Sequence, residues 1–168
     1  MDEVTTKVDT GGGLVVGHDG SPHADRALVW AADWAKRAGC ALHVVRTWTL
    51  STSPRPDSWE PGFAPPMTDF EQAVRAALEK DVAALALPGP APTCHVLHGS
   101  AARRLVEVSR TAELIAISAR GRGGFAGLVM GATTDQVVRH SRCPVVVVPA
   151  GALDDEPAAP DRAMRQDP

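Results

Sequence analysis

Short apolar runs alternate along this chain with longer segments in which apolar residues recur every three or four positions. Runs of the first kind are typical of buried strands, and segments of the second kind are typical of amphipathic helices. The pattern predicts strands at residues 14–18, 41–47, 93–97, 114–118 and 145–148. It predicts helices at residues 22–38, 68–85, 100–110 and 133–140. Five strands that alternate with four helices indicate an α/β fold.

Two of the predicted helices carry start signals. Ser21 comes directly before Pro22, and these residue types suit the N-cap and the first helical position. Thr68 is followed three residues later by Glu71, which is the spacing of a capping box. We therefore expect the second helix to begin at Thr68.

The alternation also predicts the sheet topology. Right-handed crossovers between parallel strands place helices on both faces, so we expect a doubly wound parallel sheet in the order 3-2-1-4-5. Ligands bind such sheets beyond the carboxyl ends of the strands, where the strand order reverses. Asp19 follows the first strand there and is the candidate partner of a base, a ribose or a water on Mg²⁺. Val44, in the second strand, is the candidate to pack against a base.

Residues 114–148 carry the strongest functional signal, LIAISARGRGGFAGLVMGATTDQVVRHSRCPVVVV. An apolar strand runs into a glycine-rich loop, and a helix follows. A helix that begins after such a loop presents backbone N–H groups and the positive end of its dipole, which favour phosphate. A nucleotide is therefore the expected ligand.

Other phosphate motifs fit this loop less well. No Walker A motif is present in the sequence. Gly121, Gly123 and Ala126 match a loose dinucleotide fingerprint, but the acidic residue expected about 20 positions later is missing, which excludes NAD. Arg120 and Arg122 flank the glycines, and each is either a phosphate partner or a solvated surface arginine.

Composition narrows the class of protein further. The 168 residues are 44% hydrophobic and 22% charged, which suffices for one domain. A net charge of −3 without a basic stripe argues against nucleic-acid binding. No apolar leader region and no run of about 18 apolar residues is present, so we expect a cytoplasmic protein without a membrane span. The polar ends, residues 1–12 and 150–168, are expected to be disordered, with one domain at residues 13–149.

The sequence gives no catalytic constellation. No Ser/His/Asp or Cys/His arrangement and no carboxylate pair near the loop emerges, and an ATP-hydrolysing enzyme lacks an evident base. His18, His95 and His98 are interpreted as structural or surface residues, since His95 and His98 point to opposite faces of a strand. We therefore expect a binding protein and not an enzyme.

Three segments resemble the universal stress protein family: V-V-G-H-D-G-S-P, R-G-R-G-G-F-A-G-L-V-M-G and C-P-V-V-V-V. The resemblance covers about residues 13–149. Nucleotide-binding members of that family carry the motif G-x2-G-x9-G-[ST], which here falls on Ser118, Gly121, Gly131 and Ala132. Two positions depart, because Ser118 replaces a glycine and Ala132 lacks a hydroxyl, while Thr133 is one position out of register. The departures leave two readings open.

The first reading that the resemblance implies is a Rossmann-like, adenine nucleotide alpha hydrolase-like fold that binds ATP, with or without Mg²⁺. The expected site combines Asp19 and Val44, from the topology, with the motif residues Ser118, Gly121, Gly131 and Ala132 and with Thr133. Its role would be regulatory, in stress or dormancy. The second reading is a nucleotide-free interaction module of the same fold. Backbone amides supply most of a phosphate-binding loop, so the intact glycines favour the first reading.

Two further features bear on assembly and access. Residues 145–148 form an uncharged edge strand bracketed by Pro144 and Pro149, which predicts antiparallel pairing of two copies. The resemblance implies the same homodimer; the alternative is a strand covered by the chain's own tail. Residues 50–67 hold five prolines with Trp59 and Phe63, and are interpreted as a flap over the base pocket or as a simply mobile loop.

Overall fold

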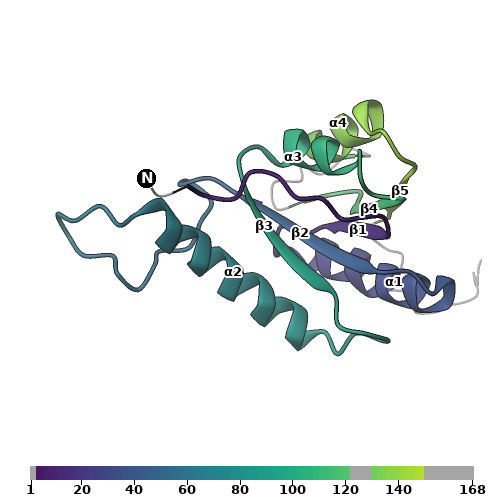
Figure 1. Ribbon diagram of the computed structural model, residues 1–168, viewed down its shortest axis with the longest axis horizontal. Coiled ribbons are helices and arrows are strands. Elements are labelled where there is room, and N and C mark those ends of the chain that lie inside the picture. Colours follow the sequence, from purple (N-terminus) through teal and green to yellow (C-terminus); the bar gives the residue numbers. More distant parts are fainter. Residues whose placement is uncertain (1–2, 122–129, 150–168) are drawn as a thin grey trace, which may run out of the picture.

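The computed structural model describes residues 3–121 and 130–149. The predicted tail at 150–168, Arg122, Gly123 and Ala126 lie outside these residues. Within them, strands and helices alternate as expected (Figure 1). The elements are β1 (Leu14–Gly17), α1 (Pro22–Ala38), β2 (Leu42–Trp48), α2 (Met67–Ala84), β3 (Thr93–His98), α3 (Ala101–Val108), β4 (Leu114–Ser118), α4 (Ala132–His140) and β5 (Val145–Val148).

The sheet is parallel and has the predicted order β3-β2-β1-β4-β5. In the central strand, Val16 pairs with Val44 of β2 on one side and with Ala116 of β4 on the other. The strand order therefore reverses between β1 and β4, and the segments that follow these two strands emerge next to each other. β3 and β5 form the two edges.

Two helical layers cover the sheet. α1 and α2 lie on one face and α3 and α4 on the other (Figure 1). Leu14, Val16 and Val44 point into the first layer, while Val15 and Val45 point into the second. Strand residues on both faces are buried because a parallel sheet has helices on both sides. The doubly wound α/β prediction is confirmed.

The helix starts agree with the sequence in one case and differ in another. At Ser21 the hydroxyl accepts a hydrogen bond from the Ala24 N–H (3.2 Å), with Pro22 at the first position, as predicted. The capping box at Thr68 is wrong, because α2 begins at Met67 behind Pro66 and has no side-chain cap. Glu71 instead accepts hydrogen bonds at both carboxylate oxygens from the N–H and hydroxyl of Thr5 (2.7 Å each).

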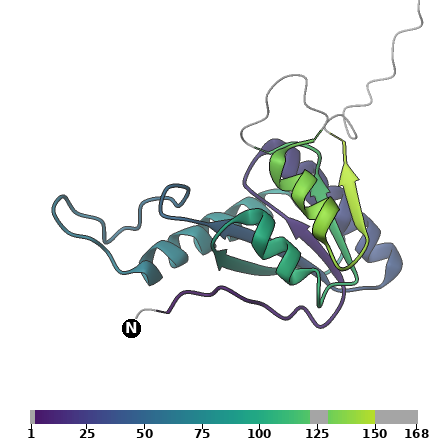
Figure 2. The same ribbon diagram turned by 90° about the horizontal axis from the view of Figure 1, so that it is seen from above.

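Residues 3–12, expected to be disordered, form neither helix nor strand but are hydrogen-bonded to the fold. The carbonyl of Thr5 accepts from the His98 N–H at the end of β3 (2.8 Å), and Thr10 forms hydrogen bonds with Thr111 in the connection between α3 and β4. Val4 packs against the core of the α1–α2 face and Val8 against that of the α3–α4 face. The arm therefore passes around the β3 edge from one layer to the other (Figures 1 and 2).

Candidate functional site

The turn after β1 and the start of the loop after β4 meet as the topology predicts. A Cβ atom placed on Gly121 would lie 2.8 Å from Oδ2 of Asp19, so the carboxylate occupies the space beside the glycine. The other oxygen, Oδ1, accepts a hydrogen bond from the Ser21 N–H (2.9 Å). Asp19 is exposed. The geometry thus presents a carboxylate at the mouth of the crevice between β1 and β4.

The first turn of α4 closes the same crevice. Gly131 is its N-cap, and the Gly131 N–H donates to the carbonyl of Ala119 (2.8 Å). A Cβ on Gly131 would lie 3.8 Å from the nitrogen of Gly121, so the two motif glycines approach each other. Ala132 and Thr133 follow in the first turn, where backbone N–H groups have no partner inside the helix. These donors and the helix dipole suit an anion.

Ser118 has an internal role that its motif position did not predict. Its hydroxyl donates to the carbonyl of Arg120 (2.6 Å), and its own carbonyl accepts from the hydroxyl of Thr134 (2.8 Å). Both Ser118 and Thr134 are buried. The serine therefore holds the start of the loop, and Thr134, which the sequence did not single out, holds α4 against the end of β4.

Val44 does not line the crevice. Its side chain is fully buried in the core between the sheet and the α1–α2 layer. The expectation that this side chain packs against a base is therefore not met by its position. The reason is its place in the middle of β2, where it pairs with Val16 and Cys94, and not at the carboxyl end of the strand.

A buried polar network beside Asp19 escaped the sequence analysis. His18 is 3% exposed, and its Nε2 lies 2.8 Å from Oδ1 of Asp25 on α1. Its Nδ1 lies 2.6 Å from Nη2 of Arg46 on β2. The same guanidinium donates to Asp81 on α2 (2.8 Å), and Arg46 is 7% exposed. The network links the turn after β1 to three other elements.

Burial lowers the pKa of His18 from its ordinary value, and the positive charge of Arg46 acts in the same direction. The hydrogen bond to Asp25 opposes this shift. His18 is therefore neutral at pH 7. Because an arginine has no acceptor atom, Nδ1 accepts from Arg46 and the ring proton lies on Nε2, where it is donated to Asp25.

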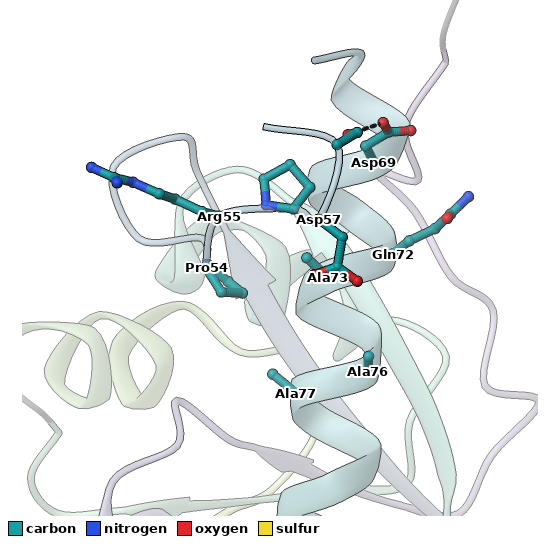
Figure 3. Close-up of a pocket in the computed structure, with 10 residues that line it drawn as sticks. Pro54, Arg55, Asp57, Asp69, Gln72, Ala73, Ala76 and Ala77 are labelled. Atoms are coloured by element: carbon teal, nitrogen blue, oxygen red, sulfur yellow. Dashed lines mark hydrogen bonds between the residues drawn. The ribbon is translucent and has the colours of Figure 1, made fainter. Parts of the chain in front are cut away.

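The segment at residues 50–67 lies along α2 and not over the crevice. Residues 54–58 and the first half of α2 enclose a pocket of about 560 Å³, in which Asp57 lies beside Ala73 (Figure 3). The segment lies on the far side of the molecule from α4 (Figures 1 and 2). Trp59 and Phe63 are exposed as expected. The flap hypothesis gains no support from this arrangement.

Other classes of site receive no support from the part of the chain that the structure describes. There, no three His, Cys, Asp or Glu residues are grouped so that they could hold a metal ion. None of the described helices combines the length and the apolar character that crossing a membrane requires. Cys40, Cys94 and Cys143 are free thiols. The candidate that the topology and the contacts support is the junction of Asp19 with Gly121 at the carboxyl ends of β1 and β4.

Comparison with known proteins gives consistent matches. The sequence profile of the universal stress protein family matches residues 13–149. A universal stress protein of Mycobacterium bovis is 31% identical over 90% of this chain and 51% of its own length. One of Mycobacterium tuberculosis is 32% identical over 80% of this chain and 44% of its own length. The chain thus spans about half the length of the curated relatives it matches.

Solved structures show the same fold. The universal stress protein UspA from Lactobacillus plantarum superposes with a TM-score of 0.61 at 19% identity, over 84% of this chain and 99% of that one. A universal stress protein in complex with cAMP gives 0.54 at 21% identity, over 85% and 99%. One from Archaeoglobus fulgidus in complex with dAMP gives 0.56 at 20% identity, over 80% and 95%.

Proposed function

This chain belongs to the universal stress protein family, and from that premise we propose that it binds ATP in the crevice between β1 and β4 and acts as a regulatory module in stress or dormancy. The observation that carries the proposal is the 2.8 Å approach of Asp19 Oδ2 to the Cβ position of Gly121. Only a glycine leaves this space for a carboxylate and a ligand together.

Each part of the crevice would have a separate task. The backbone N–H groups of Gly121, Ala132 and Thr133 would donate to phosphate oxygens at the N-terminus of α4. Asp19 would accept from a ribose hydroxyl or an amino group of the base, or hold Mg²⁺ through a water. Val44 has no side-chain surface to offer. No group in this set is placed as a catalytic base, so we propose binding without catalysis.

Two of the structural neighbours support this ligand class, because they are described in complex with cAMP and dAMP. Both ligands are adenine nucleotides. We propose the triphosphate because the first N–H groups of α4 have no partner inside the helix and lie close to Gly121, which suits a ligand with several phosphates. A cytoplasmic location and a homodimer through β5 complete the proposal.

Isothermal titration with Mg-ATP tests the proposal, after a denatured sample has been checked for nucleotide carried through purification. We expect micromolar affinity that is lost in Gly121→Val and weakened about tenfold or more in Asp19→Ala. We expect Trp59→Ala, in the distant loop, to bind like the wild type. Absence of both binding and carried nucleotide would refute the proposal.

The second reading, a nucleotide-free dimeric interaction module, is favoured by two observations. The Ser118 hydroxyl is used inside the protein, on the Arg120 carbonyl, and residue 132 has no hydroxyl to offer. The double variant Ser118→Gly, Ala132→Ser restores the family motif. If only this variant binds Mg-ATP, the departures have disabled the site and the second reading holds.

A further inference from the structure

The proposed function leaves a network of buried charges beside the site without a role. Arg46 and His18 are both buried, between the sheet and the α1–α2 layer. Burying a guanidinium is costly unless it is paired and hydrogen-bonded. Here it has three acceptors: Asp81 Oδ2, His18 Nδ1 and, from Nε, the His18 carbonyl (3.3 Å).

These contacts hold the backbone on both sides of Asp19. Before Asp19, the carbonyl of His18 accepts from Arg46. After it, the Gly20 N–H donates to Nδ1 of His18 (3.3 Å). The conformation of Asp19 is therefore set by the imidazole of His18 and the guanidinium of Arg46, neither of which reaches the crevice itself.

We propose that His18 and Arg46 are positioning residues for Asp19, and that protonation of His18 releases the turn at residues 18–21 and weakens nucleotide binding. This inference rests on the proposed function, since it concerns the regulation of the same site. It makes the affinity for nucleotide a function of pH.

The sign follows from the two ring nitrogens. Neutral His18 carries its proton on Nε2, toward Asp25, and accepts at Nδ1 from Arg46 and Gly20. A second proton would turn Nδ1 into a donor that faces two donors, one of them charged. Asp25 on α1 and Asp19 in the turn favour that proton, whereas burial and Arg46 on β2 oppose it. Asp81 on α2 pairs with the guanidinium of Arg46.

Neutral His18 is thus the binding-competent form, and its lowered pKa keeps it neutral at pH 7. Affinity is constant above the pKa of His18 and falls as pH drops through it. If the protonated form does not bind, the dissociation constant rises about tenfold for each pH unit below that pKa.

The test is the dissociation constant of Mg-ATP from pH 8 to pH 5 in the full chain and in two matched variants. His18→Asn keeps an acceptor near the position of Nδ1 but does not titrate. His95→Asn replaces another histidine whose pKa burial lowers, on β3 and outside the network. We expect a steep profile for the wild type and His95→Asn and a flat one for His18→Asn, while protonation of ATP is common to all three.

A second pair of variants tests Arg46 at pH 8, where His18 is neutral. Arg46→Met removes the donors and we expect it to weaken Mg-ATP binding about tenfold or more, since hydrogen bonds to charged groups are involved. Arg104→Met removes an arginine of similar burial on α3, paired with Glu107, and serves as the control. We expect its affinity to match the wild type.

The possible outcomes distinguish a failure of the pH mechanism at His18 from a failure of nucleotide binding. Equal pH profiles for wild type and His18→Asn would leave ATP binding intact and overturn the inference. If the wild type binds no nucleotide at any pH, the proposed function fails. NMR then tests whether protonation of His18 releases the turn at residues 18–21. Amide signals of Gly20 and Ser21 that follow the titration of the His18 imidazole with one midpoint support release of the turn. Amide signals that stay fixed while His18 titrates overturn it, and this readout needs no variant to fold.

Discussion

Gly121 leaves room for the Asp19 carboxylate because it has no side chain. Within 4 Å of the missing Cβ, the contacts are with Oδ2 and Cγ of Asp19, at 2.8 and 3.9 Å. Asp19 is exposed, and its carboxylate is held by a hydrogen bond from the Ser21 N–H and not by contacts with the core. A methyl group here would therefore move a functional group without unfolding the domain.

We predict that Gly121→Ala lowers affinity for Mg-ATP about tenfold or more, since it displaces a charge-assisted hydrogen bond worth about 1.5–3 kcal/mol. The free energy of unfolding should fall by about 1 kcal/mol or less, because the half-buried Gly121 would meet the carboxylate of Asp19 and not the core. Calorimetric titration and urea unfolding measure the two quantities.

A double-mutant cycle with Asp19→Ala provides the control. If the methyl acts through the carboxylate, then Gly121→Ala adds no further loss of affinity in the Asp19→Ala background. Equal, additive losses in the two backgrounds would mean that the methyl group blocks the ligand directly, and would contradict the mechanism.

Sequence reasoning located only part of this site. Topology predicted that Asp19 faces the glycine-rich loop, because the ends of β1 and β4 lie side by side, and the family motif singled out Gly121 and Gly131 in that loop. The contacts between His18 and Arg46 were missed, because the two residues are 28 positions apart in the chain and no periodic pattern links them. The sequence signal for these contacts was an arginine, Arg46, among the apolar residues of a predicted strand.

At the scale of elements, the four helices differ in how their first turn is satisfied. The hydroxyl of Ser21 caps α1, whereas Ser100 precedes α3 in the same N-cap position without a side-chain hydrogen bond. The two serines thus have the same residue type and position but different contacts, so they form a natural pair for comparison.

Ser21→Ala should destabilise the protein by about 1 kcal/mol, within the range of about 0.5–2 kcal/mol known for N-cap serines. Ser100→Ala should cost much less, because it removes no cap hydrogen bond. The midpoints of urea unfolding at constant slope measure both changes. Similar losses in the two variants would show that the Ser21 hydroxyl contributes nothing specific.

The boundaries of the elements were predictable to within a few residues, but their side-chain partners were not. The spacing of Thr68 and Glu71 fits a capping box. However, Pro66 is the N-cap of α2, and the Glu71 carboxylate accepts its hydrogen bonds from Thr5. The arm itself shows an alternation of Val4, Thr6, Val8 and Thr10 toward the protein. That period of two was present in the sequence, within a segment whose polar composition suggested disorder.

At the scale of the whole molecule, the family resemblance and the apolar pattern predicted the same sheet order, and the structure has that order. The connections from β1 to β2, from β2 to β3 and from β4 to β5 join neighbouring strands, whereas the connection from β3 to β4 crosses to the other side of β1. Right-handed connections then place α1 and α2 on one face of the sheet and α3 and α4 on the other. Assembly does not follow in this way. β5 is an edge strand, and Val145, Val146 and Val147 are only partly buried.

We predict that Val146→Lys prevents homodimer formation, because a charge on an edge strand opposes pairing with a second copy. Val138→Lys, on the exposed face of α4, adds the same charge away from the edge and should remain dimeric. Size-exclusion chromatography with light scattering separates the dimer from the 17.6 kDa chain. A wild type that stays at 17.6 kDa at high concentration would contradict the proposal.

The N-terminal arm contacts one edge of the sheet, at β3, so the two edges are not equally exposed. At the β3 edge, the His98 N–H is already bonded to Thr5, and the arm wraps around the strand. A sheet with both edges open can add copies without limit, which is the route to fibres. In the proposed homodimer, pairing through β5 would use the opposite edge of each copy. An arm that already occupies the end of β3 disfavours the addition of further copies there, so the proposed assembly would stop at two.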